Sequence, residues 1–341
     1  MRSALYAGDS TIVVEERPPV PPAPGEVQID VAYTGICGTD LHILHGSMDH
    51  RVRIPQPIGH EMSGHVAAVG AGVAGLAVGT PVTVMPLRWC GTCPACLAGH
   101  HHICQRLDFI GIDSAGAMQQ RWTVPAEVVI PLPADLPLTH GALVEPTAVA
   151  VHDVRRAGLR AAEKAVVIGG GPIGVLIALV ARSVDAEVVL VEVDPQRRTV
   201  AEKLGIRTLD PAHDTLAARV EAWTGGAGAA VAFEVSGSAA GVAAAVELLA
   251  VRGRLVVVGI HSQPREIDLF RVFWRELTMV GARVYQRGDY DTAIDLLRAG
   301  KVGAETLITH IEPLTNAAAA FEVLRGGGNA MKVLISCQET S

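Results

Sequence analysis

A glycine-rich turn in the middle of the chain places the strongest limit on its fold. Residues 169–174 read Gly-Gly-Gly-Pro-Ile-Gly, which matches the pattern G-x-G-x-x-G. The pattern alone is weakly specific, but an apolar strand is expected before it at 164–168 and a helix after it at 173–183. The first glycine allows the tight turn, the second lets the backbone approach a pyrophosphate, and the third lets helix and strand pack closely. We therefore expect a βαβ unit that binds a dinucleotide at its helix N-terminus, with the binding residues Gly169, Gly171, Pro172, Ile173 and Gly174.

An acidic residue follows this turn at the distance that a nucleotide site requires. Glu192 lies near the end of the next expected strand, 187–193. A carboxylate about 20 residues beyond the first glycine binds the adenosine ribose hydroxyls and would repel a 2′-phosphate. NAD is therefore favoured over NADP, a preference that Arg197 and Arg198 on the following helix would soften. We assign to the cofactor site Glu192, Arg197, and the later strand end Val258, Gly259 and Ile260.

The pattern of expected secondary structure changes near residue 146. Before it, a proline-rich segment and short strand-like runs indicate an irregular β domain; the runs are 26–32, 66–69, 81–85 and 127–131. After it, apolar strands alternate with helices, which predicts a parallel sheet covered on both faces; the further strand candidates are 229–235, 254–260 and 277–284. A length of 341 residues suits two domains, which we place at 1–146 and 147–285. From the pattern alone, residues 286–341 would complete either domain.

The composition limits the classes of protein to which this chain can belong. Lys and Arg number 28 against 35 Asp and Glu, and the resulting net charge of −7 argues against a general nucleic-acid binder. Two long stretches without formal charge, 62–87 and 165–181, are interrupted by glycines and prolines. We therefore expect buried strands and turns there, with a buried helix at the end of the second stretch, and no membrane association. The first residues lack the apolar core of a signal peptide, and we expect a cytoplasmic protein.

Four of the six cysteines are clustered in the pattern C-x2-C-x2-C-x7-C, formed by Cys90, Cys93, Cys96 and Cys104. Clustered cysteines in a chain of this size without a secretion signal are typical of metal ligands. Four thiolates form the closed tetrahedral site of a structural zinc ion. An iron–sulfur cluster is the main rival, but the bacterial spacing that ends in C-x3-C-P is absent. The neighbouring run His100, His101 and His102 is expected to lie on the surface beside the filled site.

A second constellation is dispersed along the chain. It comprises Gly59-His60-Glu61-x2-Gly64-x5-Gly70-x2-Val73 and, upstream, Cys37-Gly38-Thr39-Asp40-x-His42. A catalytic zinc uses three protein ligands and leaves one position open, which Cys37, His60 and a carboxylate would satisfy. Taken singly, the thiol, the imidazole and the acid each have an ordinary structural explanation, as a buried apolar group, a core histidine and a surface acid.

Together these motifs resemble those of the zinc-containing medium-chain dehydrogenase/reductase family, and most closely its sorbitol, threonine and butanediol dehydrogenase branch. The 59–73 signature, the four cysteines, Glu145-Pro146 and the glycine turn occur in the family's order, and the resemblance covers essentially the whole chain. It implies an α/β fold in which a GroES-like irregular β catalytic domain carries an inserted Rossmann domain, a doubly wound parallel sheet. It also implies that residues 286–341 return to the catalytic domain, and that the protein is a homotetramer or a homodimer.

The resemblance further implies roles for individual residues. Cys37, His60 and Glu61 would hold a catalytic zinc, and Glu145 would lie close to the metal or reach it through water, so either acid remains open as the direct third ligand. Thr39 and His42 match the family's proton relay. The implied reaction is hydride transfer between NAD and a secondary alcohol, which is a polyol, cyclitol, sugar acid or diol, with zinc polarising the alcohol oxygen.

The resemblance also has departures that bear on the substrate. In sorbitol dehydrogenases a tyrosine follows the relay histidine, and this chain has Ile43 there. Those enzymes also place an arginine directly before a tyrosine, whereas here Val284 precedes Tyr285. Sorbitol is therefore disfavoured. Two alternatives are a non-enzymatic NAD-binding relative and a zinc-independent quinone reductase, and the intact set of zinc ligands and relay residues argues against both.

Overall fold

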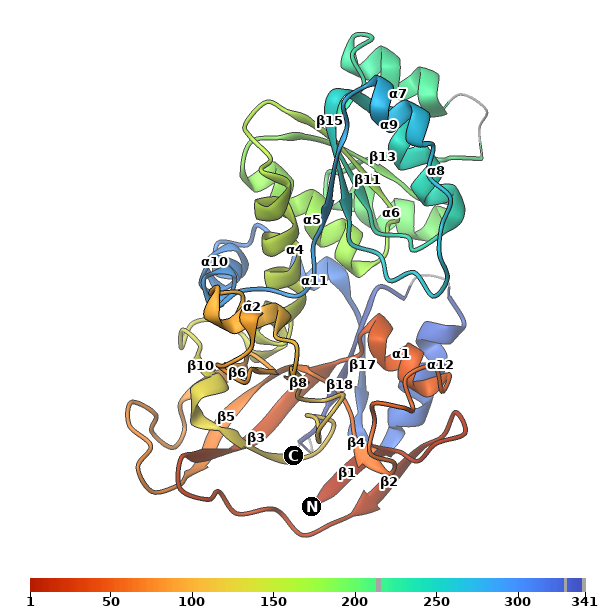
Figure 1. The fold of residues 1–341 in the computed structure, drawn as a ribbon. Coiled ribbons are helices and arrows are strands. Elements are labelled where there is room, and N and C mark those ends of the chain that lie inside the picture. The colour runs from red at the N-terminus through yellow and green to blue at the C-terminus, as the bar shows by residue number, and fades with distance from the viewer. Residues whose placement is uncertain (213–215, 328–329, 339–341) are drawn as a thin grey trace. The chain divides into compact units, whose positions relative to one another are not determined.

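The computed structural model describes residues 1–341 apart from 213–215, 328–329 and 339–341 (Figure 1). The chain divides into two compact units: the first contains Met1–Glu145, Gln286–Ala299 and Ile308–Ser341, and the second contains Pro146–Tyr285 and Gly300–Leu307. The boundaries expected from the sequence lie next to two of these divisions. Residues 300–307, which were expected in the first unit, group with the second because α11 (Ala304–Leu307) packs against α6 (Pro195–Lys203).

The first unit is built on a seven-stranded sheet in the order β10-β6-β5-β3-β18-β17, with β9 also paired to β3. Its central strand β3 (Glu26–Gly35) runs antiparallel to both β5 (Glu61–Val69) and β18 (Lys332–Ser336). Gly35 lies opposite Glu61 on one side and opposite Leu334 on the other. The C-terminal strand therefore lies next to the segment that carries the dispersed motif.

The remaining elements of the first unit are short. Its other strands are β1 (Arg2–Tyr6), β2 (Ile12–Glu16), β4 (Gln56–Pro57), β6 (Pro81–Val84), β7 (Leu87–Arg88), β8 (Asp108–Phe109), β9 (Arg121–Pro125), β10 (Val129–Pro131) and β17 (Ile308–Pro313). Its helices are α1 (Gly38–Leu44), α2 (Pro94–Leu97), α3 (Leu138–Gly141), α10 (Arg287–Arg298), α12 (Ala317–Arg325) and the short turns η1 (His101–Ile103), η2 (Ala126–Val128) and η3 (Leu314–Asn316). Short strands joined by turns agree with the irregular β domain that the sequence predicts.

The second unit is a six-stranded parallel sheet in the order β13-β12-β11-β14-β15-β16. The order reverses between β11 and β14, as in the doubly wound dinucleotide fold. The strands are β11 (Lys164–Ile168), β12 (Glu187–Val191), β13 (Arg207–Leu209), β14 (Ala229–Glu234), β15 (Leu249–Val257) and β16 (Thr278–Gly281). The helices besides α6 and α11 are α4 (Val144–Ala157), α5 (Pro172–Ser183), α7 (Leu216–Thr224), α8 (Ala239–Leu248) and α9 (Leu269–Trp274).

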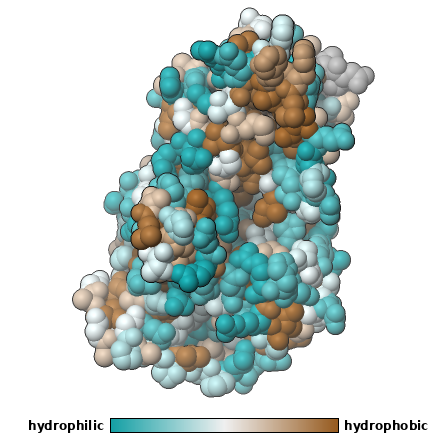
Figure 2. Space-filling model, viewed as in Figure 1, coloured by the Kyte–Doolittle hydropathy of each residue, from teal (hydrophilic) through white to brown (hydrophobic). Residues whose placement is uncertain are grey.

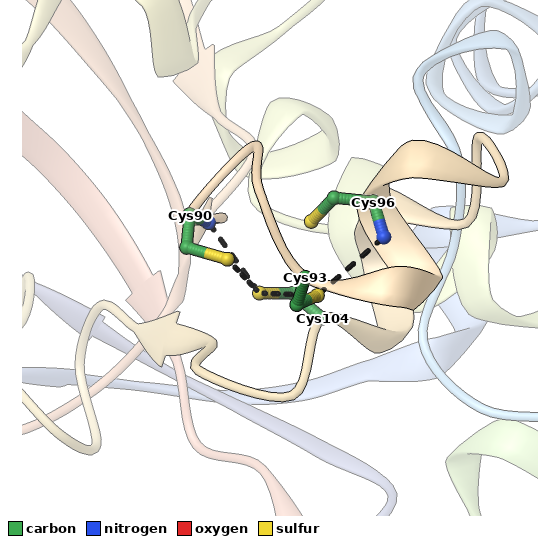
Figure 3. A group of neighbouring side chains, drawn as sticks. All are labelled: Cys90, Cys93, Cys96 and Cys104. Carbon is green, nitrogen blue, oxygen red and sulfur yellow. Dashed lines mark hydrogen bonds between the residues drawn. The ribbon is translucent and has the colours of Figure 1, made fainter.

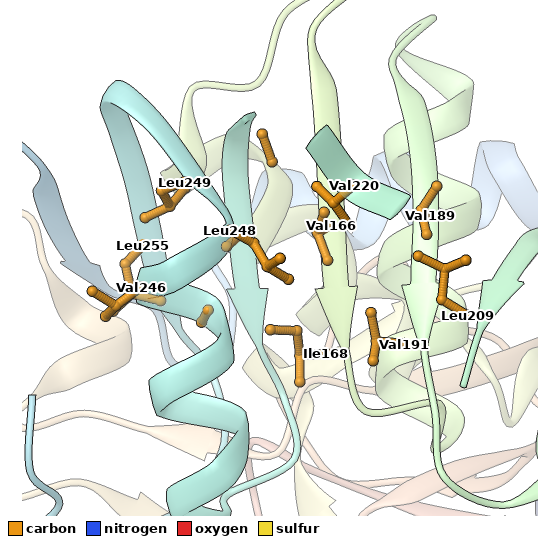
Figure 4. Packing of buried hydrophobic residues seen from close by; sticks show 13 residues of the cluster. Val166, Ile168, Val189, Val191, Leu209, Val220, Val246, Leu248, Leu249 and Leu255 are labelled. Atoms are coloured by element: carbon orange, nitrogen blue, oxygen red, sulfur yellow. The ribbon is translucent and has the colours of Figure 1, made fainter. Parts of the chain in front are cut away.

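Both faces of this sheet are buried. Val166 and Ile168 of β11 belong to an apolar cluster with residues of β12, β14, β15 and α8 (Figure 4). Ala165 and Val167 alternate with them along the strand and are also fully buried, on the face where Val167 meets the start of α5. Helices α5 and α8 therefore cover opposite faces, as the near-continuous apolar strands predict.

Three strands differ in their bounds from the pattern. The strand expected at 254–260 is β15, which begins at Leu249 and ends at Val257. The strand expected at 187–193 ends at Val191, because Asp194 caps α6 by accepting hydrogen bonds from the backbone N–H groups of Gln196 and Arg197. The strand expected at 277–284 ends at Gly281, before Val284 adopts a φ of 50°. No helix in the described part of the chain is long and apolar enough to span a membrane.

Candidate metal centres and cofactor site

The four clustered cysteines converge on one point in the lobe formed by residues 87–109 (Figure 3). Their sulfur atoms all lie within 4.8 Å of one another. Cys104 Sγ is 3.5 Å from Cys90 Sγ and 3.8 Å from Cys93 Sγ. Zinc–sulfur bonds of about 2.3 Å in a tetrahedron place sulfur atoms about 3.8 Å apart, so the spacing suits a structural zinc ion.

The local backbone of the lobe presents these thiols. Cys93 caps α2, where its sulfur accepts a hydrogen bond from the backbone N–H of Cys96, and Pro94 occupies the first helical position. Hydrogen bonds from the backbone of Thr92 and the side chain of Arg106 lower the pKa of Cys90 to about 5. Burial raises the pKa of Cys96 to about 12. Ionisation of all four thiols therefore calls for a cation among them, which is the condition that zinc satisfies.

The three histidines of the lobe lie outside this four-sulfur group. His100 and His101 are exposed as expected, and the ring of His101 stacks on Trp89 with centroids 5.0 Å apart. The expectation of a surface position is wrong for His102, which is only 8% exposed. The short 3₁₀ turn η1 explains the difference, because three residues per turn direct consecutive side chains to different sides.

Cys37, His60 and Glu61 form a second group, whose ligand atoms also lie within 4.8 Å of one another. Cys37 is the N-cap of α1, and its sulfur accepts a hydrogen bond from the backbone N–H of Thr39. His60 directly precedes β5, and Glu61 is the first residue of that strand. A thiolate, an imidazole and a carboxylate make a three-ligand set that fits a catalytic zinc with one open position.

Asp40 lies behind this group and was missed from the sequence. Its Oδ2 accepts a hydrogen bond from the Cys37 backbone N–H, and its Oδ1 lies 3.8 Å from His60 Nδ1. Burial raises the pKa of Asp40 to about 6. Burial also acts to lower the pKa of His60, but the negative charges of Asp40 and Cys37 outweigh it and hold that pKa well above its ordinary value. A dication would neutralise this concentration of negative charge.

Lys332 is the second residue that sequence reasoning missed. Its Nζ lies 2.6 Å from Glu61 Oε2 and 2.8 Å from Oε1, and both side chains are at most 3% exposed. Burial alone would lower the pKa of Lys332, but the charges of Glu61 and Cys37 outweigh it and raise that pKa. Gly35 leaves the space for this contact, because a Cβ there would collide with the Glu61 carboxylate.

The other catalytic candidates occupy different positions around the group. Glu145 is 4% exposed and adds to the negative charge that His60 experiences, but it lies outside the three-ligand group. Thr39 is half-buried and His42 is exposed, and both lie on α1, where residues three apart share a face. Ile43, which directly follows His42, is fully buried, so its side chain faces the core.

The glycine turn has the geometry that a pyrophosphate requires. Gly169 has a φ of 105°, which favours glycine, and a Cβ on Gly174 would collide with the Gly169 carbonyl oxygen. A Cβ on Gly171 would meet only Arg197 Nη1, at 4.0 Å, so the N-terminus of α5 is open to a ligand. The Arg197 guanidinium therefore lies beside the phosphate-binding turn.

Glu192 lies directly beneath the turn. Its Oε2 accepts a hydrogen bond of 2.6 Å from the Gly170 backbone N–H, and its Oε1 accepts one of 2.8 Å from the Asp194 backbone N–H. Arg198 pairs with Asp210 at 2.8 Å and also donates to the carbonyl oxygens of Glu192 and Val193. Val258, Gly259 and Ile260 follow β15 at the same carboxyl edge of the sheet, where ligands of this fold bind.

The two missed residues carry different sequence signals. Asp40 stands inside the Cys37 motif, three residues after the helix N-cap, so the capping pattern marks it. Lys332 is a single charge in the apolar run 330–335, and its partner Glu61 is 271 residues away in the sequence. Only the pairing of β18 with β3 brings the two together.

Comparison with known proteins agrees with both centres. Residues 23–134 match the alcohol dehydrogenase GroES-like domain family, and residues 172–299 match the zinc-binding dehydrogenase family. The 2-dehydro-3-deoxy-L-galactonate 5-dehydrogenase of Pseudoalteromonas atlantica is 50% identical over 337 residues, covering 99% of each chain. The L-galactonate-5-dehydrogenase of Escherichia coli is 32% identical, covering 88% of this chain and 89% of its own.

A solved structure shares the whole fold. The 2R,3R-butanediol dehydrogenase of Bacillus subtilis superposes with a TM-score of 0.91 at 30% sequence identity, covering 98% of this chain and 99% of its own. The chain has two groups of metal ligands and a doubly wound sheet, which suit a zinc-dependent dehydrogenase. The similarity to these relatives extends along nearly the full chain. The chain therefore belongs to the zinc-containing medium-chain dehydrogenase/reductase family and is a zinc-dependent dehydrogenase that acts on CH–OH groups.

Proposed function

We propose that the substrate is a six-carbon sugar acid that is oxidised at carbon 5, as in 2-dehydro-3-deoxy-L-galactonate. The observation that carries this proposal is the 50% identity to a 5-dehydrogenase of that compound over 99% of both chains. The E. coli relative is likewise named for carbon 5 of a sugar acid. Ile43 supports the choice over sorbitol, because it stands where a polyol-contacting tyrosine would be and its side chain is buried.

We propose NAD as the cofactor in preference to NADP. We expect the adenosine ribose beside the Glu192 carboxylate, which accepts a hydrogen bond from the Gly170 backbone N–H of the glycine turn, and a negative charge there opposes a 2′-phosphate. Arg198, which would otherwise favour the phosphate, is committed to Asp210 and to backbone carbonyl oxygens. Arg197 at the glycine turn is placed to contact the pyrophosphate instead.

The residues of the site divide the chemistry among them. Zinc bound by Cys37, His60 and Glu61 would supply a Lewis acid that polarises the alcohol oxygen. Asp40 Oδ1 lies 3.8 Å from His60 Nδ1 and adds negative charge beside the imidazole. The Thr39 hydroxyl would accept the alcohol proton, and the exposed His42 would deliver it to solvent. Glu145 adds negative charge that favours the metal.

We also propose that the protein forms a homodimer or homotetramer through the second unit. Four large apolar side chains of α9 are strongly exposed: Leu269 at 71%, Phe270 at 69%, Phe273 at 74% and Trp274 at 71%. Figure 2 shows hydrophobic residues gathered at the position of α9 in Figure 1. Neighbouring β16 is the last strand of its sheet, so one of its edges remains open to pairing. Exposed apolar patches beside a free strand edge suit subunit contact.

We place the protein in the cytoplasm and expect no partner beyond its small molecules and its own copies. A reducing compartment keeps the four cysteines of the lobe available to zinc instead of forming disulfides. The net charge of −7 gives no support for binding to nucleic acid.

The decisive experiment offers the purified, zinc-loaded protein a panel of alcohols with NAD and with NADP. The panel contains 2-dehydro-3-deoxy-L-galactonate, L-galactonate, sorbitol, a cyclitol and 2,3-butanediol. We expect formation of reduced cofactor with NAD and a sugar acid, and a carbonyl at carbon 5 by NMR of the product. Preferred oxidation of a neutral alcohol would reject the sugar-acid proposal, and a preference for NADP would reject the role given to Glu192.

Metal analysis separates this function from its two rivals. The dehydrogenase requires two zinc ions per chain, one for each group of ligands. A zinc-independent quinone reductase would keep its activity when the metal at Cys37, His60 and Glu61 is removed. A non-enzymatic relative would bind NADH and turn over none of the alcohols.

A further inference from the structure

Glu234 is a fully buried carboxylate at the end of β14 that the reaction as described above does not use. Its Oε1 accepts hydrogen bonds from the backbone N–H groups of Ser236 and Gly237, each 3.0 Å, and from the Ser236 hydroxyl at 2.5 Å. Its Oε2 lies 2.9 Å from His261 Nε2. A buried charge persists only where donors compensate it, so four donors on one carboxylate indicate a built anchor.

The donors come from two different loops. Ser236 and Gly237 follow β14, whereas His261 follows β15 and lies one residue beyond Ile260. The backbone N–H groups of Val258 and Gly259 both donate to the Glu234 carbonyl oxygen at 2.9 Å. The carboxylate and the carbonyl of this one residue therefore tie both loops together.

The two loops are pressed closely around the carboxylate. A Cβ on Gly259 would lie 2.6 Å from the Gly237 backbone nitrogen and 2.8 Å from Glu234 Oε2, so no larger residue fits there. A Cβ on Gly169 of the glycine turn would lie 2.9 Å from the Ser236 backbone nitrogen. The loop after β14 is therefore packed directly against the phosphate-binding turn.

Arg265 closes the arrangement. Its Nε donates to His261 Nδ1 at 3.4 Å, and its Nη2 donates to the Gly237 carbonyl oxygen at 3.3 Å. Because an arginine nitrogen can only donate, Nδ1 of His261 accepts, and Nε2 carries the proton that it donates to Glu234. Residues 262–264 are exposed and line an open pocket of about 450 Å³, so they are not held by packing into the core.

The position of the pair relates it to one half of a dinucleotide. Glu192 marks the adenosine side of the point where the strand order reverses, between β11 and β14. The other half of a dinucleotide crosses to the side of β14 and β15. The loops that Glu234 joins therefore line the nicotinamide side.

We propose that Glu234 and His261 are positioning residues for the nicotinamide half of the cofactor, which they serve by holding the loops after β14 and β15 together in the form that receives it. This inference rests on the proposed use of a nicotinamide cofactor. It assigns a role to the side chain that follows Ile260, and it makes the hydrogen bond between His261 and the Glu234 carboxylate a link between the two loops.

The test compares binding of NADH with binding of ADP, which lacks both the nicotinamide and its ribose. Binding of both is measured directly, by NADH fluorescence and by ADP competition, without any substrate. In His261→Ala and in Glu234→Gln we expect the Kd for NADH to rise about tenfold, because a hydrogen bond to a charged group is lost, while the Kd for ADP changes by less than about twofold. His261→Gln, whose amide nitrogen can still donate to Glu234, should recover most of the affinity.

Matched controls keep the outcomes distinct. Glu247→Gln alters an exposed carboxylate of neighbouring α8 and should leave both affinities unchanged. Equal weakening of NADH and ADP would show general damage to the fold and overturn the inference, as would unchanged NADH affinity in His261→Ala. Failure of the parent protein to bind NADH would instead remove the cofactor proposal, and this inference with it.

Discussion

At the scale of single residues, Lys332 and Glu61 each depend on the other's charge because both are buried. Lys332→Met leaves the Glu61 carboxylate without its cation, which costs about 3–5 kcal/mol for a buried pair. Zinc at the three-ligand group would compensate that charge. We therefore expect Lys332→Met to be much less stable than the parent when both are zinc-depleted. When both are zinc-loaded, the difference in stability should be smaller. Thermal unfolding of the two proteins in both forms measures this.

Two companion variants test that explanation. Lys332→Arg keeps the cation and should retain most of the stability in both forms. Addition of Glu61→Gln to Lys332→Met removes the unpaired charge and should recover part of the loss in the zinc-depleted form. An equal loss with and without zinc in Lys332→Met would mean that the lysine contributes packing alone.

His42 offers a second test at this scale. It is exposed at the end of α1, so His42→Ala should leave the fold and the zinc content unchanged. Loss of a proton-transfer group slows turnover on the order of 10²-fold. Added imidazole buffer should restore part of the rate in steady-state assays, since it can carry the proton from the same position. His45→Ala, which removes the neighbouring exposed histidine, is the control; no slowing in His42→Ala would exclude it from the relay.

At the scale of elements, the lobe of residues 87–109 has a small apolar cluster of its own, made of its cysteines with Ala95 and Leu107 packed against them. Its only strand pairing is between the two-residue strands β7 and β8. The zinc site should therefore supply most of its folding free energy. Cys96→Ser should lower the zinc content from two ions per chain to about one and expose the lobe to proteolysis, while the far-ultraviolet circular dichroism of the two sheets persists.

Zinc analysis and limited proteolysis with mass spectrometry provide the measurement. His101→Ala removes an exposed side chain of the same lobe that lies outside the metal group, so its zinc content should match that of the parent. A Cys96→Ser protein that still binds two zinc ions would show that the Cys96 thiolate is not needed for zinc binding.

The elements also show what a sequence of this kind can reveal. The glycine turn predicts the β11–α5 junction because its steric demands are local, and the four-cysteine pattern predicts its group because the close ligand spacing constrains the backbone. The group of Cys37, His60 and Glu61 is dispersed in the sequence, and its prediction depended on the family resemblance. The ends of β12 and β16 are not predictable from apolar runs alone, since a helix cap at Asp194 and a positive φ at Val284 decide them. The contact of Lys332 with Glu61 is not predictable from the sequence pattern, because the two residues are 271 positions apart and only strand pairing brings them together.

At the scale of the whole molecule, the exposed face of α9 is the feature that a lone chain does not explain. Phe270 and Trp274 stack with ring centroids 5.8 Å apart and so form one continuous aromatic surface. A stable interface buries roughly 800 Å² per partner, and large aromatic residues near its centre contribute most to affinity. We expect the parent protein to sediment as a dimer or tetramer.

Phe273→Asp tests this expectation, because Phe273 is 74% exposed and its replacement costs the isolated unit little. A carboxylate at the centre of an apolar contact is desolvated without a partner, so the assembly should dissociate in sedimentation velocity at micromolar concentration. Leu97→Asp is the matched control, since Leu97 is 76% exposed but lies on α2 in the other unit. If the assembly survives Phe273→Asp, or if the parent sediments as a monomer, the proposal that α9 forms the subunit interface is wrong.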